Sequence, residues 1–385
     1  MTQTATEVAN GHAAPPARET GEAIAFRKSM RFFLSPILEL LDDETVSEIM
    51  INGPEDVFVE RKGRIEHTGL TFKDDHAVRA AANHIAQFVG KSITEEEPIL
   101  DGRLPDGSRI CIILPPISGR GVSVNIRKFA KKAIDPSFLI DVKAVTPEAL
   151  EFILVAVEAA QNIIISGGTG SGKTTLLNIF SNAFPDSERI ITIEDTRELQ
   201  LQKQHVVTLE ARPADAYGKG QITIRDLFVA TLRMRPDRIV VGEVRRGEAL
   251  DMLQAMSSGH SGSMATLHAD TPMGACGRLE TMCMMADSGL PIVAIRRQIA
   301  DALHLIVQAV RLHSGRRLVT HITEIHFDEQ RNEYQPKDLF VLDTDLEFPM
   351  LKWTGETPHL AEEVKWMGLA DRIQLNRKMF GLEGS

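Results

Sequence analysis

A glycine-rich stretch at residues 167–174, GGTGSGKT, has the residue types and spacing that most clearly suggest chemistry. It follows an apolar run, NIIIS, and leads into a second one, TLLNIF. Glycines let the backbone curl so that its N–H groups point inward, and a helix that starts there adds a partial positive charge. We therefore interpret the stretch as a strand-to-helix loop that binds a polyphosphate. The residues expected to hold the phosphates are Gly168, Thr169, Gly170, Ser171, Gly172, Lys173, Thr174 and Thr175.

Two side chains of this loop have defined roles in the motif. Lys173 is expected to reach the β- and γ-phosphates, and Thr174 to donate its hydroxyl oxygen to Mg²⁺. The predicted ligands are therefore ATP and Mg²⁺. The alternative is a glycine-rich turn that binds nothing, which the combination of strand, helix, lysine and threonine disfavours.

Acidic residues end two further apolar runs. IITIED ends in Glu194 and Asp195, and RIVVGE ends in Glu243. Because ligands of open α/β sheets lie at the carboxyl ends of the strands, these side chains are expected near the loop. We predict that Glu243 activates the attacking water and that Glu194 holds Mg²⁺ through its hydration shell. The alternative for either residue alone is a solvated loop carboxylate.

Two histidines are further candidates. His268 ends the apolar run MATLHA, so it is expected at the same edge of the sheet, and His260 lies in the glycine-bracketed stretch SSGHSGS. An ordinary hydrogen-bonded histidine is the alternative at both positions, and it has more weight for His260.

Hydrolysis also needs positive charge at the transition state, where an arginine contributes about 10³ to 10⁵ in rate. The stretches 109–114 and 122–127 are predicted strands joined by a Pro/Gly loop, and antiparallel pairing would place Arg109 opposite Arg127. Two adjacent guanidinium groups repel unless an anion bridges them, so this pair is our arginine-finger candidate, with Arg103 a weaker third. The alternative is a set of surface arginines.

The elements that must position these residues fall into four predicted segments. Residues 1–22 read as a disordered tail because they have almost no large apolar side chains. Residues 23–145 alternate short strands and helices, as in a small α+β domain. Residues 146–340 begin with a helix over 147–160, capped by Thr146, and then show continuous apolar strands typical of a parallel α/β sheet covered on both faces. Residues 341–385 read as a helical extension.

Composition excludes several classes of protein. The formal net charge of -10 disfavours binding to nucleic acid, which draws on an excess of Lys and Arg. Three cysteines without C-x-x-C spacing suggest neither a disulfide framework nor a zinc site, and fit a reducing cytosol. The sequence shows no charge-free apolar stretch of transmembrane length and no signal-peptide pattern.

Taken together, these motifs resemble those of the secretion and pilus-assembly ATPases of the type II/type IV family. GGTGSGKTT is similar to the family's Walker A, RIITIEDTREL to its Asp box, LRMRPDRIVVGEVR to its Walker B and GHSGSMATLHA to its His box. The stretch ITIRDL and the ending LKWTGETPHLAEEV favour the CpaF branch, which serves tight-adherence (Flp) pili. Ser261 stands where the family pattern has Asp, and the tetracysteine zinc module of the type II relatives is missing.

The resemblance implies a RecA-like P-loop core preceded by a smaller, PAS-like α+β domain. It further implies a homo-hexamer on the cytoplasmic face of the inner membrane, where ATP hydrolysis drives domain motion against a platform protein. Arg109 and Arg127 match the family's N-terminal arginines. The alternatives are a RecA-like nucleic-acid motor, a conjugative type IV secretion ATPase, and a scaffold that binds ATP with little turnover.

Overall fold

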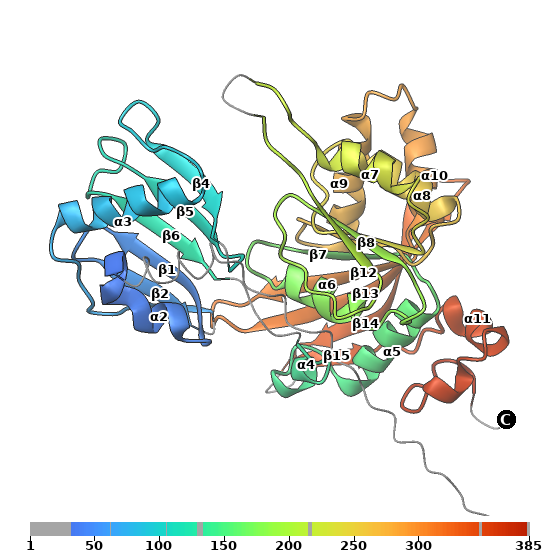
Figure 1. Cartoon of the computed structure of the whole chain (residues 1–385). Coiled ribbons are helices and arrows are strands. Elements are labelled where there is room, and N and C mark those ends of the chain that lie inside the picture. The colour runs from blue at the N-terminus through green and yellow to red at the C-terminus, as the bar shows by residue number, and fades with distance from the viewer. Residues whose placement is uncertain are drawn as a thin grey trace, which may run out of the picture. The chain divides into compact units, whose positions relative to one another are not determined.

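The structure is a computed structural model that describes residues 32–61, 63–104, 106–128, 134–214, 218–345 and 349–382. The chain forms two compact units, which divide between Ala130 and Lys131 (Figure 1). The predicted boundary between residues 145 and 146 thus falls later in the chain, inside the second unit. The predicted disordered tail, residues 1–22, lies outside the described residues.

The first unit is built on an antiparallel sheet with the strand order β3-β2-β1-β6-β5-β4. Its buried face packs against one helix, whose apolar residues Val78, Ala82 and Ile85 share one side because they recur at helical spacing. Its elements are η1 (Ser35–Ile37), α2 (Leu38–Asp42), β1 (Val46–Asn52), β2 (Val57–Arg61), β3 (Arg64–His67), α3 (Asp75–Phe88), β4 (Ile99–Arg103), β5 (Arg109–Ile113) and β6 (Ser123–Arg127).

The register of β5 and β6 pairs Arg109 with Arg127 and Cys111 with Asn125. The predicted antiparallel pairing is therefore confirmed. Both arginines lie on the face of the sheet opposite the core, since the alternating residues Ile110 and Ile126 are buried.

The second unit is built on a mixed sheet with the order β15-β14-β13-β12-β7-β11-β10-β8-β9. The run from β12 to β9 is parallel, as predicted, and β13 to β15 add an antiparallel edge. The bounds are β7 (Ile163–Gly167), β8 (Ile190–Glu194), β9 (Val206–Glu210), β10 (Arg238–Val241), β11 (Met264–Leu267), β12 (Leu305–Arg311), β13 (Arg317–Asp328), β14 (Glu333–Asp343) and β15 (Met350–Trp353).

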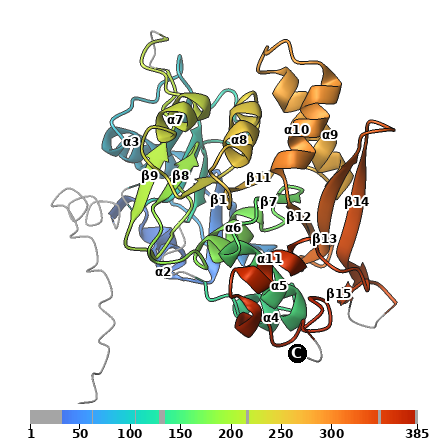
Figure 2. The same ribbon diagram turned by 90° about the vertical axis from the view of Figure 1, so that its right-hand side faces the viewer.

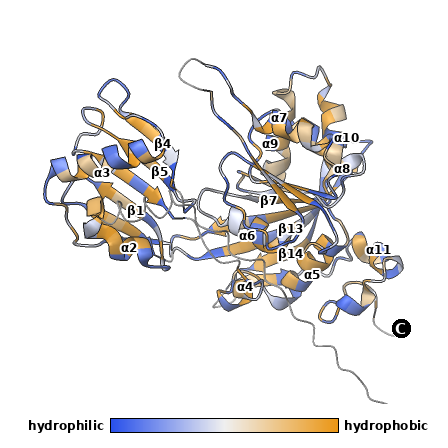
Figure 3. Cartoon of the chain, in the orientation of Figure 1, coloured by the Kyte–Doolittle hydropathy of each residue, from blue (hydrophilic) through white to orange (hydrophobic). Residues whose placement is uncertain are grey.

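Helices cover both faces of this sheet, with α7–α10 above it and α5, α6 and α11 below it in the view of Figure 2. Each face has its own buried apolar cluster, one around Phe152 and Phe180 and the other around Leu253 and Leu279. Figure 3 shows the apolar residues along the strands between them. The helices are α4 (Phe138–Asp141), α5 (Pro147–Glu158), α6 (Lys173–Ser181), α7 (Ile224–Thr231), α8 (Glu248–Ser257), α9 (Pro272–Met284), α10 (Ile292–Ala302), α11 (Leu360–Trp366) and η2 (Ala370–Arg372).

The last part of the chain corrects the prediction of a helical extension over 341–385. Strand β14 continues to Asp343 and β15 adds a further strand, because Leu342 pairs with Leu351, which is buried. Beyond α11, the chain docks on α5: Phe380 packs against Phe152, and the Glu151 carboxylate accepts backbone N–H bonds from residues 374–376. This segment therefore belongs to the core of the second unit.

A buried ion pair fixes the start of β10. Arg238 is 2% exposed, and its guanidinium donates to both oxygens of Glu188, at 2.6 and 3.0 Å. The guanidinium also fills the space beside Gly262, where an added Cβ would lie 1.6 Å from Nη1 of Arg238. With φ at +79°, only glycine is suited to this position.

Replacing Gly262 with alanine is therefore expected to displace Arg238 and to destabilise the second unit by about 3 kcal/mol. Thermal unfolding followed by circular dichroism would show a melting temperature about 10 °C below that of the wild type. Gly277→Ala is the matched control, because Gly277 lies in α9 and an added Cβ would meet nothing within 4 Å. In that variant the free energy of unfolding should rise by about 0.5–1 kcal/mol, because alanine is favoured over glycine inside a helix. Equal melting of the two variants would contradict this account.

Candidate active site

The glycine-rich loop connects β7 to α6, the context that the sequence predicts. Gly172 precedes the helix with φ at 94°, a left-handed conformation suited to glycine, and α6 then begins at Lys173. The helix N-terminus and its free N–H groups thus face the loop, which is the arrangement that binds phosphates.

Lys173 is buried, with 7% of its surface exposed. Its ammonium Nζ donates to the carbonyl oxygen of Gly168 at 2.9 Å, and Ser171 Oγ donates to the same oxygen at 2.9 Å. Burial lowers the pKa of Lys173, while the nearby Glu243 carboxylate opposes this shift. The loop therefore holds a desolvated cation whose protein partner, a neutral carbonyl, is weaker than a phosphate.

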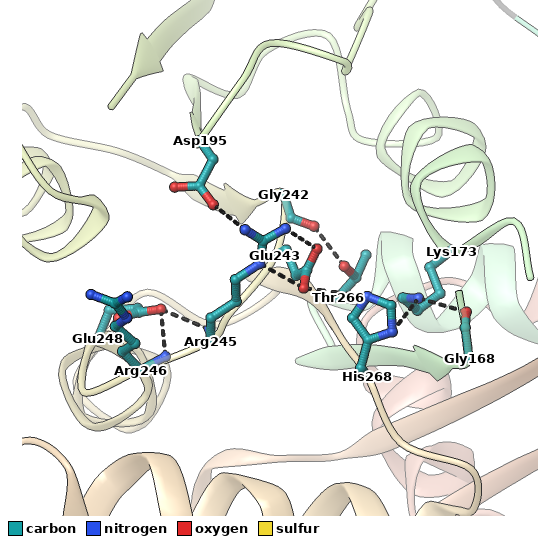
Figure 4. Close-up of polar contacts among 10 residues, drawn as sticks. All are labelled: Gly168, Lys173, Asp195, Gly242, Glu243, Arg245, Arg246, Glu248, Thr266 and His268. Carbon is teal, nitrogen blue, oxygen red and sulfur yellow. Dashed lines mark hydrogen bonds and ion pairs between the residues drawn. The ribbon is translucent and has the colours of Figure 1, made fainter. Parts of the chain in front are cut away.

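His268 lies between Lys173 and Glu243 (Figure 4). Its Nδ1 is 3.4 Å from Nζ of Lys173, and its Nε2 is 3.4 Å from Oε1 of Glu243. A neutral imidazole with its proton on Nε2 satisfies both contacts, and burial followed by the Lys173 charge lowers the pKa of His268. Residues from the ends of three different strands thus form one line.

His260, in contrast, does not join this line. It lies in the loop held by Arg238, where its backbone N–H donates to Ala255 and its carbonyl accepts from Ser263 Oγ. Both bonds belong to the backbone, whereas Nδ1 of the imidazole is buried and has no hydrogen-bond partner among the described residues.

Glu194 is 2% exposed and lies against Gly242, where an added Cβ would be 2.9 Å from its Cγ. Its Oε1 accepts the backbone N–H groups of Glu198 and Leu199 at 2.8 and 2.9 Å. Its Oε2 is buried and has no hydrogen-bond partner among the described residues. Burial raises the pKa of Glu194 to about 7. The Glu194 carboxyl therefore lies close to Gly242, the residue before Glu243. Its oxygen Oε1 holds the backbone turn at Glu198 and Leu199.

The donors around the loop fit a magnesium ion. Mg²⁺ prefers oxygen ligands, keeps several waters, and is commonly held by one or two carboxylates with substrate phosphates. Thr174 is half-buried in the first turn of α6, and Glu194 has a buried carboxylate oxygen without a protein partner in the described part of the chain. The remaining predicted loop residues are Thr169, which is exposed, and Thr175, which is half-buried.

In the first unit, the register aligns Arg103, Arg109 and Arg127 across β4, β5 and β6. The weaker third candidate thus lies in the same row as the pair. Glu48 of β1 continues the row beside Arg127. Three arginines thus occupy neighbouring positions on three adjacent strands, and the Glu48 carboxylate stands at the end of their row.

Two arginines near the phosphate loop are missing from the sequence-based candidates. Arg317 Nε donates to the carbonyl oxygen of Gly170 at 2.9 Å, and a guanidinium nitrogen of Arg311 lies 3.1 Å from the position of a Cβ added at Gly170. The two residues pair across β12 and β13. The signal in the sequence is their placement on either side of Ser314-Gly315, a dipeptide typical of turns.

The parallel strands, the loop and the helix that follows it define a RecA-like P-loop NTPase core, preceded by a smaller antiparallel domain. A profile described as "Type II/IV secretion system protein" matches residues 33–339. The chain therefore belongs to the type II/IV secretion system protein family. In the described residues, no helix is long and apolar enough to cross a membrane.

Individual relatives agree with this assignment. A putative conjugal transfer protein of Mycobacterium tuberculosis is 34% identical over 302 residues, which cover 77% of this chain and 85% of that protein. The type IV secretion system protein VirB11 of Brucella suis is 33% identical over 336 residues, covering 80% and 92%. The solved structure of the pilus retraction motor PilT with bound ADP has a TM-score of 0.53 at 20% identity and covers 79% and 84%, which shows a shared fold.

The raised pKa of Glu194 gives a pH-dependent contribution to stability. Because its folded pKa of about 7 exceeds the ordinary value of 4.5, the folded chain retains a proton that the unfolded chain releases between these values. The free energy of unfolding should therefore fall as the pH rises through this window, by up to about 3 kcal/mol. Glu194→Gln should remove this fall.

The measurement is the melting temperature of nucleotide-free protein between pH 5 and pH 8, for wild type and variant. The variant should melt higher than wild type at pH 8, and the difference should shrink towards pH 5. Parallel pH profiles for the two proteins would contradict a protonated Glu194.

Proposed function

We propose that the protein hydrolyses ATP at this site. The contact line from Lys173 through His268 to Glu243 carries the proposal, because it joins a phosphate-binding cation to a carboxylate. The half-buried Glu243 has the type and position of a group that orients an attacking water. Binding without turnover would need no such carboxylate next to the phosphate loop.

Each residue then has a distinct task. The loop from Gly168 to Gly172 directs backbone N–H groups at the phosphates, and Lys173 exchanges its carbonyl partner for them. Thr174 would hold Mg²⁺ directly, and Glu194 would hold it through water. When bound, Mg²⁺ neutralises charge on the β- and γ-phosphates. Glu243 orients the water. His268 contacts both Glu243 and Lys173 and so fixes the position of the carboxylate relative to the lysine.

We further propose that Arg109 and Arg127 of the first unit stabilise the charge that develops on the terminal phosphate. Their support is the register that places them side by side, where both guanidinium groups would donate to one phosphate. Arg103 shares their row and would strengthen the same field.

The wider role that we propose is that of a motor for pilus assembly or secretion. It is a homo-hexamer at the cytoplasmic face of the inner membrane, where domain motion acts on a membrane platform protein, and nucleic acid is not its substrate. The motifs quoted for the CpaF branch favour tight-adherence (Flp) pilus assembly. The conjugal transfer relative supports a second candidate, a conjugative type IV secretion ATPase. Identifying the membrane protein that co-purifies from the native host would distinguish the two.

Lys173→Ala and Glu243→Gln should separate binding from chemistry. Lys173→Ala removes the phosphate-binding cation, so isothermal calorimetry should show a loss of ATP affinity of at least about tenfold. Glu243→Gln keeps the side-chain shape, so it should bind ATP and lose about 10² or more in phosphate release. Near-normal affinity in the first variant would refute the loop assignment. Unchanged phosphate release in the second would favour an ATP-binding scaffold.

Arg109→Ala and Arg127→Ala should each keep nucleotide affinity and lose about 10³ in turnover, as expected for groups that act on transition-state charge. The control is Arg120→Ala. Arg120 belongs to the same unit, its side chain is 84% exposed, and its Nη1 lies 3.8 Å from Oδ2 of Asp56. This variant should retain activity. Joint loss of binding and assembly in the first two variants, seen by calorimetry and light scattering, would contradict this role.

A separate measurement tests the nucleic-acid alternative on the wild-type protein. ATP turnover that rises many-fold with single-stranded DNA would favour a nucleic-acid motor.

A further inference from the structure

Arg245 is bound to two carboxylates of the candidate site (Figure 4). Its Nε and Nη2 donate to Oε1 and Oε2 of Glu243, both at 2.8 Å, and its Nη1 donates to Oδ2 of Asp195 at 2.8 Å. Both oxygens of Glu243 therefore accept from one guanidinium in a bidentate pair, which is among the strongest hydrogen-bonded arrangements of side chains.

This pair makes Glu243 a poor partner for water. Burial alone raises the pKa of Glu243, but the hydrogen bond and charge of Arg245 outweigh burial and lower it. A carboxylate with a lowered pKa is a weaker base, and its oxygens already have a fixed donor. The geometry therefore describes a resting site in which the water-activating group is engaged elsewhere.

The guanidinium can leave without disturbing the backbone. Oε1 of Glu248, a buried residue at the start of α8, accepts the backbone N–H groups of Arg245 and Arg246 at 2.8 and 2.9 Å. These bonds fix the chain at the base of the side chain. The Arg245 side chain itself is 54% exposed, and that of Asp195 is 46% exposed. A fixed backbone with a solvent-facing side chain allows a change of rotamer without moving the chain, and the hydrogen bonds that the guanidinium gives up must be replaced by those to its new partner.

A terminal phosphate would compete for this guanidinium. Arg245 donates to Oε1 of Glu243, which lies 3.4 Å from Nε2 of His268, and Nδ1 of the same imidazole lies 3.4 Å from Nζ of Lys173. A phosphate group that reaches Lys173 thus enters the field of Arg245 as well. Arginine binds phosphate through the same bidentate geometry that it now uses for the carboxylate.

We propose that Arg245 is a γ-phosphate sensor: it holds Glu243 in an ion pair while no terminal phosphate is present, and transfers to that phosphate when a nucleoside triphosphate binds. The transfer frees Glu243 to orient water. This inference rests on the proposed nucleotide site, and it adds a residue that discriminates a triphosphate from a diphosphate. A diphosphate has no γ-phosphate to draw the guanidinium away, so the resting pair persists with ADP.

The test compares the affinity of the full-length protein for Mg²⁺-ADP and for the Mg²⁺ complex of a non-hydrolysable ATP analogue, by calorimetry. Arg245→Gln should lose about tenfold in affinity for the analogue and change its ADP affinity by less than about twofold. Arg245→Lys should recover part of the lost affinity, because it keeps the charge without the bidentate geometry. The matched control, Arg246→Gln, changes the same charge at the next residue of the loop and should leave both affinities as in wild type.

Two results would overturn the sensor. Equal losses for ADP and the analogue in Arg245→Gln would mean that the residue only supports the site, and unchanged affinity for both would mean that its ion pairs are incidental. Both results concern the variant, and in either case the wild-type protein would still bind ADP. A wild-type protein that binds neither nucleotide would instead refute the proposed function itself.

Discussion

The register of three parallel strands is the constraint on which the candidate site depends. Val240 of β10 pairs with Met264 of β11, which in turn pairs with Ile163 of β7, so the three strands end at one edge of the sheet. Lys173 and Glu243 follow two of these ends, and neither could meet the other through His268 if one strand were shifted. A one-residue slip would turn each side chain to the opposite face.

Ionisable groups buried at the two ends of the parallel strands are stabilised in different ways. A buried charge is costly unless it is paired or hydrogen-bonded. Arg238, at the start of β10, has a bidentate carboxylate and therefore keeps a fixed charge. For Glu194, at the end of the neighbouring strand β8, burial outweighs the two backbone N–H bonds that it accepts among the described residues and raises its pKa to about 7. The same sheet thus combines a permanent charge at one end with a titratable group at the other.

The sequence predicts the elements of this fold better than it predicts the contacts between distant elements. The phosphate loop and the pairing of Arg109 with Arg127 follow from local patterns and a short connection, which is why they could be found. The position of Arg317 beside Gly170 depends on β12 lying next to β7, far away in the chain, and no local pattern reports that. The role of Glu194 at a magnesium ion stays a prediction, because residues of a strand covered on both faces show no alternation that fixes the direction of their side chains. The helical prediction for residues 341–385 agrees with α11 and η2 but missed the end of β14 and all of β15, because an edge strand as short as β15 gives little period to detect.

The contact between Arg317 and the Gly170 carbonyl joins the parallel part of the second unit's sheet to its antiparallel part. The phosphate loop ends a parallel strand, whereas Arg317 begins the antiparallel edge that continues through β14 and β15 to the docked C-terminal helix. The antiparallel edge is therefore joined to the phosphate loop both by a side-chain contact and by the backbone pairing of β12 with β7, so the edge and the loop share one hydrogen-bonded framework.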